Sequence, residues 1–127
     1  MVAGTGALPN DELAAGAGLR VANGIVVDHA FRTSAPGIFA AGDCCAFPYR
    51  GSSVRLESWR VAQEQGAHAA RAMLGSDDPY ASVPWFWSDQ YDLTLQVAGL
   101  ADPTSAWIRR DLADGAVIVF QKDASGA

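Results

Sequence analysis

The sequence predicts an α/β unit followed by a smaller α+β unit with antiparallel strands. Three observations support this fold class. The short apolar run at 38–41 lies between turn residues, as in a strand that is buried on both faces. A helix is expected from about 58 to 74, where small residues on one face would allow close packing against a sheet. Beyond residue 84, apolar and polar residues alternate, which is typical of half-buried strands.

The composition is that of a folded protein the size of one ordinary domain. The chain has 127 residues, of which 50% are hydrophobic and 18% are charged, and its net charge is −5. Without a basic cluster, a nucleic-acid or anionic-membrane partner is not expected. No apolar run approaches the roughly 20 residues of a membrane span. Because the two cysteines are adjacent and no secretory leader is visible, we expect a cytoplasmic location.

The first part of the chain predicts short elements. Residues 1–10 are interpreted as the end of a buried strand that runs into the Gly4-Thr5-Gly6 turn. Asn10 is the predicted N-cap of a short helix with acidic residues in its first turn, ending at Gly16 or Gly18. Asn23-Gly24 predicts a hairpin between 19–21 and 25–27, because both central positions of a type I′ turn favour positive φ.

The second part of the chain predicts a loop, the long helix and a meander. Residues 48–53 are expected to form a polar loop. Strands are expected at 93–97, 106–109 and 117–120. We place a domain boundary between 1–79 and 80–127. The expected buried face of the helix comprises Ala62, Gly66, Ala69, Ala70 and Met73. Gly75 is the glycine expected directly after the end of the helix.

A glycine and an aspartate follow the apolar run at 38–41. Ligands bind beyond the carboxyl ends of strands in parallel sheets, and Gly42 would let a ligand approach the backbone closely. The Asp43 carboxylate could accept hydrogen bonds from the hydroxyls of a sugar or polyol. Taken alone, however, Gly-Asp is ordinary turn chemistry.

The surrounding residues favour the ligand interpretation. They match the element Thr-x-x-x-x-Ile-Phe-Ala-x-Gly-Asp at 33–43, which resembles the element closing the FAD domain of flavoprotein pyridine-nucleotide oxidoreductases. The resemblance implies that Asp43, with Gly42 beside it, binds the ribityl chain of FAD. It also implies that the chain comprises the C-terminal part of a FAD-binding Rossmann-like domain and an incomplete antiparallel reductase C-terminal domain.

Three further strings resemble the ferredoxin reductases of oxygenase systems, of the putidaredoxin, rhodocoxin and biphenyl dioxygenase reductase type: RLESW at 55–59, AQEQG at 62–66 and PWFWSDQ at 84–90. The implied enzyme is an NAD(P)H-dependent FAD oxidoreductase. It would pass electrons from NADH through FAD to a 2Fe–2S ferredoxin. The flavin carries this reaction, so no catalytic residue of the chain is named.

The resemblance also implies roles for particular residues. The backbone at Ser58 and Trp59 would contact the flavin ring, where the helix N-terminus favours the negative charge of reduced flavin. Trp87 would lie beside the flavin and the nicotinamide. Glu57 would face the nicotinamide pocket, and Gly4-Thr5-Gly6 would approach NADH.

Simpler interpretations of these residues stay open. Trp85 and Trp87 would share one face of a strand, where they could form a core pair, and Trp85 could equally belong to a partner surface. Glu57 could supply only a charge to the first turn of the helix. His29 and His68 stand alone in the sequence, so both are expected at the surface and no metal site is expected.

The adjacent cysteines Cys44 and Cys45 are not expected to be redox-active. Neighbouring cysteines form only a strained disulfide, and no basic residue lies near them in the sequence to activate a thiol. Small buried thiols are the default interpretation.

Neither of the two GxGxxG fingerprints that cradle the FAD and NADH pyrophosphates is present in the sequence. We therefore expect the chain to be a fragment of a reductase that does not hold FAD firmly by itself. The alternatives are a non-catalytic remnant or interaction module, or another flavoprotein such as a disulfide or quinone reductase.

Overall fold

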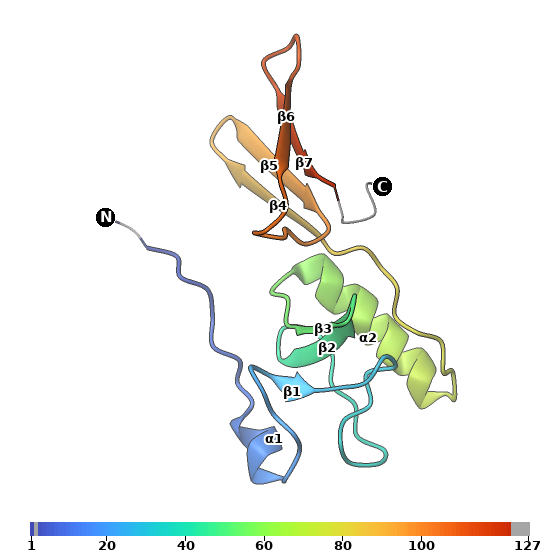
Figure 1. Ribbon diagram of the computed structural model, residues 1–127. Helices are drawn as coiled ribbons and strands as arrows, with labels where there is room; N and C mark the ends of the chain where they lie inside the picture. The colour runs from blue at the N-terminus through green and yellow to red at the C-terminus, as the bar shows by residue number, and fades with distance from the viewer. Residues whose placement is uncertain (2, 123–127) are drawn as a thin grey trace.

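The computed structural model describes residues 1 and 3–122. A lower body holds one helix against a small sheet, and two hairpins lie above it at the end of the chain (Figure 1). In chain order the elements are α1 (Glu12–Gly16), β1 (Ile25–Val26), β2 (Cys45–Tyr49), β3 (Ser52–Val54), α2 (Trp59–Met73), β4 (Trp85–Gln90), β5 (Leu93–Ala98), β6 (Trp107–Asp111) and β7 (Val117–Gln121).

The sheet of the lower body has the order β1-β2-β3. β1 pairs in parallel with the start of β2, where Ile25 lies opposite Cys45. β2 then pairs antiparallel with β3, where Phe47 lies opposite Val54. The core consists of apolar residues from the sheet, the neighbouring loops and α2, namely Val27, Phe31, Ala40, Cys45, Phe47 and Ala69.

The N-terminal expectations are confirmed in part. α1 ends at Gly16 as expected, but its N-cap is Asp11 and not Asn10, and no side chain caps it. Residues 3–10 are mostly exposed and carry no strand, whereas the strand end predicted before the Gly4-Thr5-Gly6 turn includes Val2, which lies outside the described residues. Asn23 and Gly24 do adopt positive φ values of 48° and 119°. The hairpin around them is limited to a single antiparallel bridge from Val21 to Ile25.

The predicted strand at 38–41 is wrong. Only Phe39 makes a bridge, to Arg32, and Ile38 is 45% exposed. The buried strand is β2, which begins after the turn in which the Cys45 N–H donates to the Gly42 carbonyl at 3.0 Å. β2 forms there because β1 offers it a parallel partner.

The loop predicted at 48–53 is also wrong. It contains the end of β2, a tight turn and β3. Arg50 and Gly51 form that turn with φ values of 48° and 82°. The positive φ of both residues suits a tight connection between antiparallel strands.

α2 begins and ends as predicted. Ser58 is its extended N-cap, and Gly75, with a φ of 100°, follows the C-cap Leu74. Its buried face is rotated from the predicted one and shares only Ala69 with it; the buried residues are Val61, Gln65, His68, Ala69 and Ala72. The difference arises because two polar side chains are buried with hydrogen-bond partners.

His68 is the clearest correction, because it is 6% exposed and not a surface residue. Its Nε2 lies 2.9 Å from the Asp78 carbonyl oxygen, and its ring packs edge-on against Phe31 and Tyr80. His29 is exposed, as expected.

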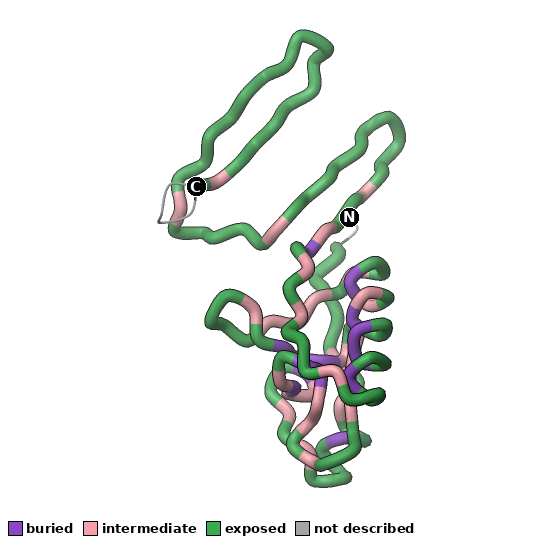
Figure 2. The backbone as a smooth tube through the Cα atoms, turned by 90° about the vertical axis from the view of Figure 1, so that its right-hand side faces the viewer, coloured by how far each residue is buried: buried purple, intermediate pink, exposed green. Residues whose placement is uncertain are grey.

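The C-terminal strands form two separate two-stranded hairpins, β4-β5 and β6-β7, and not one meander. Strands at 93–97, 106–109 and 117–120 are confirmed to within a residue or two, and β4 is an additional strand. Nearly every residue of these hairpins is exposed, whereas buried residues lie in the lower body and along one face of α2 (Figure 2). No helix in the described part of the chain is long and apolar enough to cross a membrane.

Candidate functional site

The Gly42-Asp43 turn is fixed against the first half of α2. The Gly42 N–H donates to Gln65 Oε1 at 2.8 Å, and the Cys45 thiol lies 3.3 Å from the same oxygen. Gly42 has a φ of 82°, and a Cβ placed on it would lie 3.4 Å from Ala62 Cβ. The positive φ therefore favours glycine at this position, and the turn leaves the side chain of Asp43 exposed.

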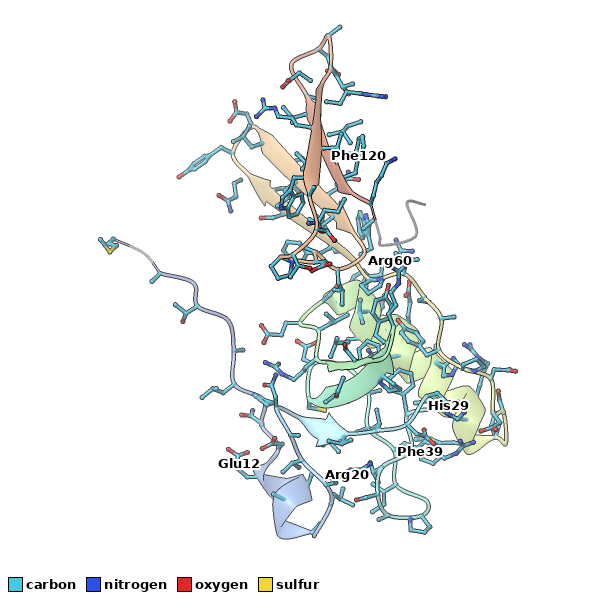
Figure 3. All side chains as sticks on the ribbon, viewed as in Figure 1. Glu12, Arg20, His29, Phe39, Arg60 and Phe120 are labelled. Atoms are coloured by element: carbon cyan, nitrogen blue, oxygen red, sulfur yellow. The ribbon has the colours of Figure 1, made fainter. Side chains whose placement is uncertain are left out.

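The N-terminal end of α2 meets the β4-β5 hairpin through tryptophans. The Ser58 hydroxyl donates to the Trp85 carbonyl at 3.1 Å. The Trp59 and Trp87 rings are edge-to-face at 6.3 Å, and the Trp85 and Trp87 rings are stacked at 5.1 Å. The Arg60 guanidinium lies 5.2 Å from the Trp85 ring centroid, at the end of α2 nearest the hairpins (Figure 3). The two β4 tryptophans thus share a face, as their spacing predicts.

This aromatic cluster is accessible. Trp59 is 67% exposed and Trp87 is 37% exposed, whereas Trp85 is half-buried. Exposed indole rings of this kind offer flat apolar surfaces on which a planar ring can stack.

A pocket of about 260 Å³ lies between the start of α2 and the β4-β5 hairpin. Its lining is mainly apolar, with Glu57 and Ser58 as the polar members. Trp85 also lines it, but neither Asp43 nor Trp87 does. The structure therefore brings most of the predicted site residues to one end of α2 without enclosing them in a single pocket.

Glu57 is held by two partners. Its carboxylate pairs with Arg55 at 2.8 Å and accepts the Ala7 N–H at 3.3 Å. Ala7 directly follows the predicted Gly4-Thr5-Gly6 segment. Neither Gly4 nor Gly6 packs closely against other residues, because a Cβ placed on either would meet nothing within 4 Å.

The cysteines form no disulfide in the structure. Burial, with a contribution from the neighbouring Cys44, raises the pKa of the Cys45 thiol to about 12. The thiol is therefore protonated at neutral pH, and it is a poor nucleophile in this environment. The described residues contain no cluster of three or more potential metal ligands.

Sequence reasoning assigned no role to two residues that organise the site, Gln65 and Arg55, although both lie in strings that carry the resemblance. Gln65 is 1% exposed and binds the Gly42 turn, but a glutamine in a helix gives no sequence signal of burial. Arg55 lies within the RLESW string. The glutamate two residues after it is the only feature of the sequence that indicates an ion pair there.

Comparison with known proteins identifies the family. Residues 1–66 match the pyridine nucleotide-disulphide oxidoreductase family, and residues 85–125 match the reductase C-terminal family. The chain is 52% identical over 124 residues to the anthranilate 1,2-dioxygenase system ferredoxin–NAD(+) reductase component of Burkholderia cepacia, covering 94% of this chain and 30% of that one. It is 46% identical over 119 residues to rhodocoxin reductase of Rhodococcus erythropolis, covering 92% and 28% of the two chains.

Solved structures of ferredoxin reductases are similar to this chain as well. The ferredoxin reductase for the CYP199A2 system from Rhodopseudomonas palustris matches with a TM-score of 0.87 and 40% identity, over 95% of this chain and 31% of that one. Putidaredoxin reductase in its covalent complex with putidaredoxin matches with a TM-score of 0.79 and 42% identity, over 90% and 28% of the two chains. The chain thus spans about 30% of the length of the relatives it matches. The predicted fold class is confirmed, and the chain belongs to the pyridine nucleotide-disulphide oxidoreductase family.

Proposed function

We propose that the chain supplies the closing part of an NAD(P)H-dependent FAD oxidoreductase. In this enzyme, electrons pass from NADH through FAD to a 2Fe–2S ferredoxin of an oxygenase system. The proposal rests mainly on one observation. The Gly42-Asp43 turn packs beside the first turns of α2, and the tryptophans of β4 contact the N-terminal end of the same helix. The names of the similar reductases support the same reaction class.

The residues at this end of α2 fit a flavin. The backbone at Gly42 has no side chain in the way of a ligand, and the carboxylate of Asp43 is exposed to accept hydrogen bonds from ribityl hydroxyls. The first N–H groups of a helix have no partner within it, and the Ser58 side chain does not cap those of α2. We assign Gly42, Asp43, Ser58, Trp59 and Trp87 to FAD.

A bound flavin would accept hydride from NADH and release single electrons to the ferredoxin. The positive end of α2 stabilises negative charge at its N-terminus by about 0.3–2 kcal/mol. Trp59 and Trp87 lie edge-to-face at 6.3 Å, and a planar ring bound against them would be shielded from water on that side.

The NADH assignment rests on Gly4, Thr5, Gly6 and Glu57. The Glu57 carboxylate already binds Arg55 and the Ala7 N–H, so its first role is to hold the N-terminal segment near α2. We place the boundary between the nucleotide-binding part and the reductase C-terminal part at 1–79 and 80–127, and we propose a cytoplasmic location.

The test is a fusion in which this chain replaces the matching segment of the Burkholderia cepacia reductase component. NADH-driven reduction of a 2Fe–2S ferredoxin is measured by the loss of ferredoxin absorbance. The proposal predicts reduction by the fusion, and loss of most of that rate in Trp87→Ala. A fusion that folds and holds flavin but reduces no ferredoxin would contradict the ferredoxin assignment and favour a disulfide or quinone reductase. A fusion that holds no flavin would favour a non-catalytic module.

A further inference from the structure

We propose that Arg55 is a positioning residue that holds Ala7, the residue after the Gly4-Thr5-Gly6 segment, beside the Gly42-Asp43 turn. The functional importance of this contact rests on the proposed function, because the two segments are the ones assigned to NADH and FAD. Its geometry is independent of that assignment.

The guanidinium of Arg55 binds three distant parts of the chain, at Ala7, Asn23 and Asp43, and also the neighbouring Glu57. Its Nη1 donates to the Asp43 carbonyl at 3.1 Å, and its Nη2 donates to the Ala7 carbonyl at 2.8 Å. Its Nε donates to Asn23 Oδ1 at 3.3 Å. The same Nη2 lies 2.8 Å from Glu57 Oε1, so all three nitrogens have a partner.

The Arg55 side chain is only 9% exposed, although it lies near the surface. Its stem packs over Gly24, where an added Cβ would lie 3.0 Å from Arg55 Cδ and 2.8 Å from the Cys44 carbonyl oxygen. The Asn23-Gly24 turn therefore leaves the space through which the arginine reaches the two segments.

Two of the four partners of Arg55 are main-chain carbonyls. Arginine can bind several acceptors at once because its donors are fixed in one plane, whereas lysine offers a single compact charge. Only the Glu57 contact depends mainly on charge. The arrangement therefore uses the shape of the guanidinium, and we expect a lysine to replace only the contact with Glu57.

Glu57 completes the connection to the N-terminal segment. It accepts the Ala7 N–H at 3.3 Å while Arg55 binds the Ala7 carbonyl, so both polar groups of this residue are held. No strand pairing holds residues 3–10. The pair Arg55 and Glu57 is thus the contact that orders this segment beside the Asp43 turn.

The experiment is ¹⁵N NMR of the 127-residue chain as wild type, Arg55→Met, Arg55→Lys and the control Arg20→Met. Arg20 is an exposed arginine on the loop between α1 and β1 (Figure 3). The backbone order parameter of Ala7 is expected to be about 0.85 in the wild type and below about 0.6 in Arg55→Met. The ¹⁵N shifts of Leu8 and Cys44 are expected to move together, because they belong to the two peptide groups whose carbonyls Arg55 binds.

A purely stabilising role would lower the melting temperature and leave the order of Ala7 in the folded chain unchanged, which would overturn the proposal. An Ala7 that is already mobile in the wild type, or that Arg55→Lys keeps fully ordered, would also overturn it. Failure of the proposed function is recognised separately, since it appears as a wild-type fusion without flavin or ferredoxin reduction while the NMR result stands.

Discussion

Replacing Gln65 by methionine tests the contact that holds the candidate FAD turn. Gln65 is 1% exposed, and its Oε1 accepts from the Gly42 N–H at 2.8 Å and lies 3.3 Å from the Cys45 thiol. Methionine keeps a similar volume but offers no strong acceptor. The Gly42 N–H is part-buried, and a donor that loses its acceptor there costs up to about 1–3 kcal/mol, to which the weak thiol donor adds little. We expect the free energy of unfolding to fall by about 1–3 kcal/mol.

The assay is urea unfolding of the 127-residue chain, followed by tryptophan fluorescence and by circular dichroism. With an m-value of about 1–3 kcal/mol/M, the midpoint should fall by roughly 1 M. Gln63→Met is the matched control, because Gln63 lies on the same helix but is exposed. Its effect should stay within about 0.5 kcal/mol.

The reasoning is refuted if Gln65→Met and Gln63→Met unfold at the same urea concentration. That result would mean that the Gly42 N–H finds water or another acceptor at no cost, so the helix would not fix the turn. A large loss in both variants would instead show that the helix tolerates methionine poorly, and it would equally remove the support for the contact.

Three other changes have expected outcomes. Gly42→Ala should destabilise the chain by about 1–2 kcal/mol, because the φ of Gly42 is 82°. Gly66→Ala, on the open face of α2, should instead stabilise the chain by roughly 0.5–1 kcal/mol. Equal urea midpoints for the two variants would contradict this. Iodoacetamide should modify Cys44 before the fully buried Cys45, and mass spectrometry showing equal rates would contradict the burial. Burial raises the pKa of Cys45 and of Tyr80 to about 12, from ordinary values of 9.0 and 10.0. The unfolded chain loses these protons first, so stability should fall as pH rises from about 9 to about 12; urea midpoints that stay constant between about pH 8 and about pH 11 would contradict it.

The sequence predicted the long helix well because its signals are local. Ser58 and Gly75 bound it in the sequence as they do in the structure. The face that it buries depends on distant residues. His68 is buried because its ring packs against Phe31 and Tyr80 and bonds to the Asp78 carbonyl. The periodicity of the helix does not show that these partners lie nearby.

The strand expected at 38–41 was misplaced for a similar reason. The apolar run there and the run at Cys45–Tyr49 are both short, and periodicity does not separate a strand from a buried turn at that length. Strand pairing determines which of the two runs becomes the strand, because β1 pairs with Cys45 and Ala46. The hairpins beyond residue 84 were recognised as strands, but nothing local indicates that β5 and β6 do not pair with each other.

The residues of the candidate site are a prediction from the sequence, and the contacts that hold the Gly42-Asp43 turn are seen only in the structure. Asp43, Ser58, Trp59 and Trp87 were named from a resemblance that the family comparison supports. Their binding roles remain proposals. The two residues that hold the Gly42-Asp43 turn, Gln65 and Arg55, bind main-chain atoms far away in the sequence, so the strings in which they lie do not reveal these contacts.

The most direct measurement of the central claim is the flavin content of the fusion protein, taken as the ratio of flavin absorbance to protein absorbance after purification. We expect about one FAD per chain in the unmodified fusion and a large loss in Asp43→Ala, because the ribityl chain loses its acceptor. The same measurement on the 127-residue chain alone should find no stoichiometric flavin, since both glycine fingerprints are absent from it. A fusion that holds full flavin after Asp43→Ala would contradict the account.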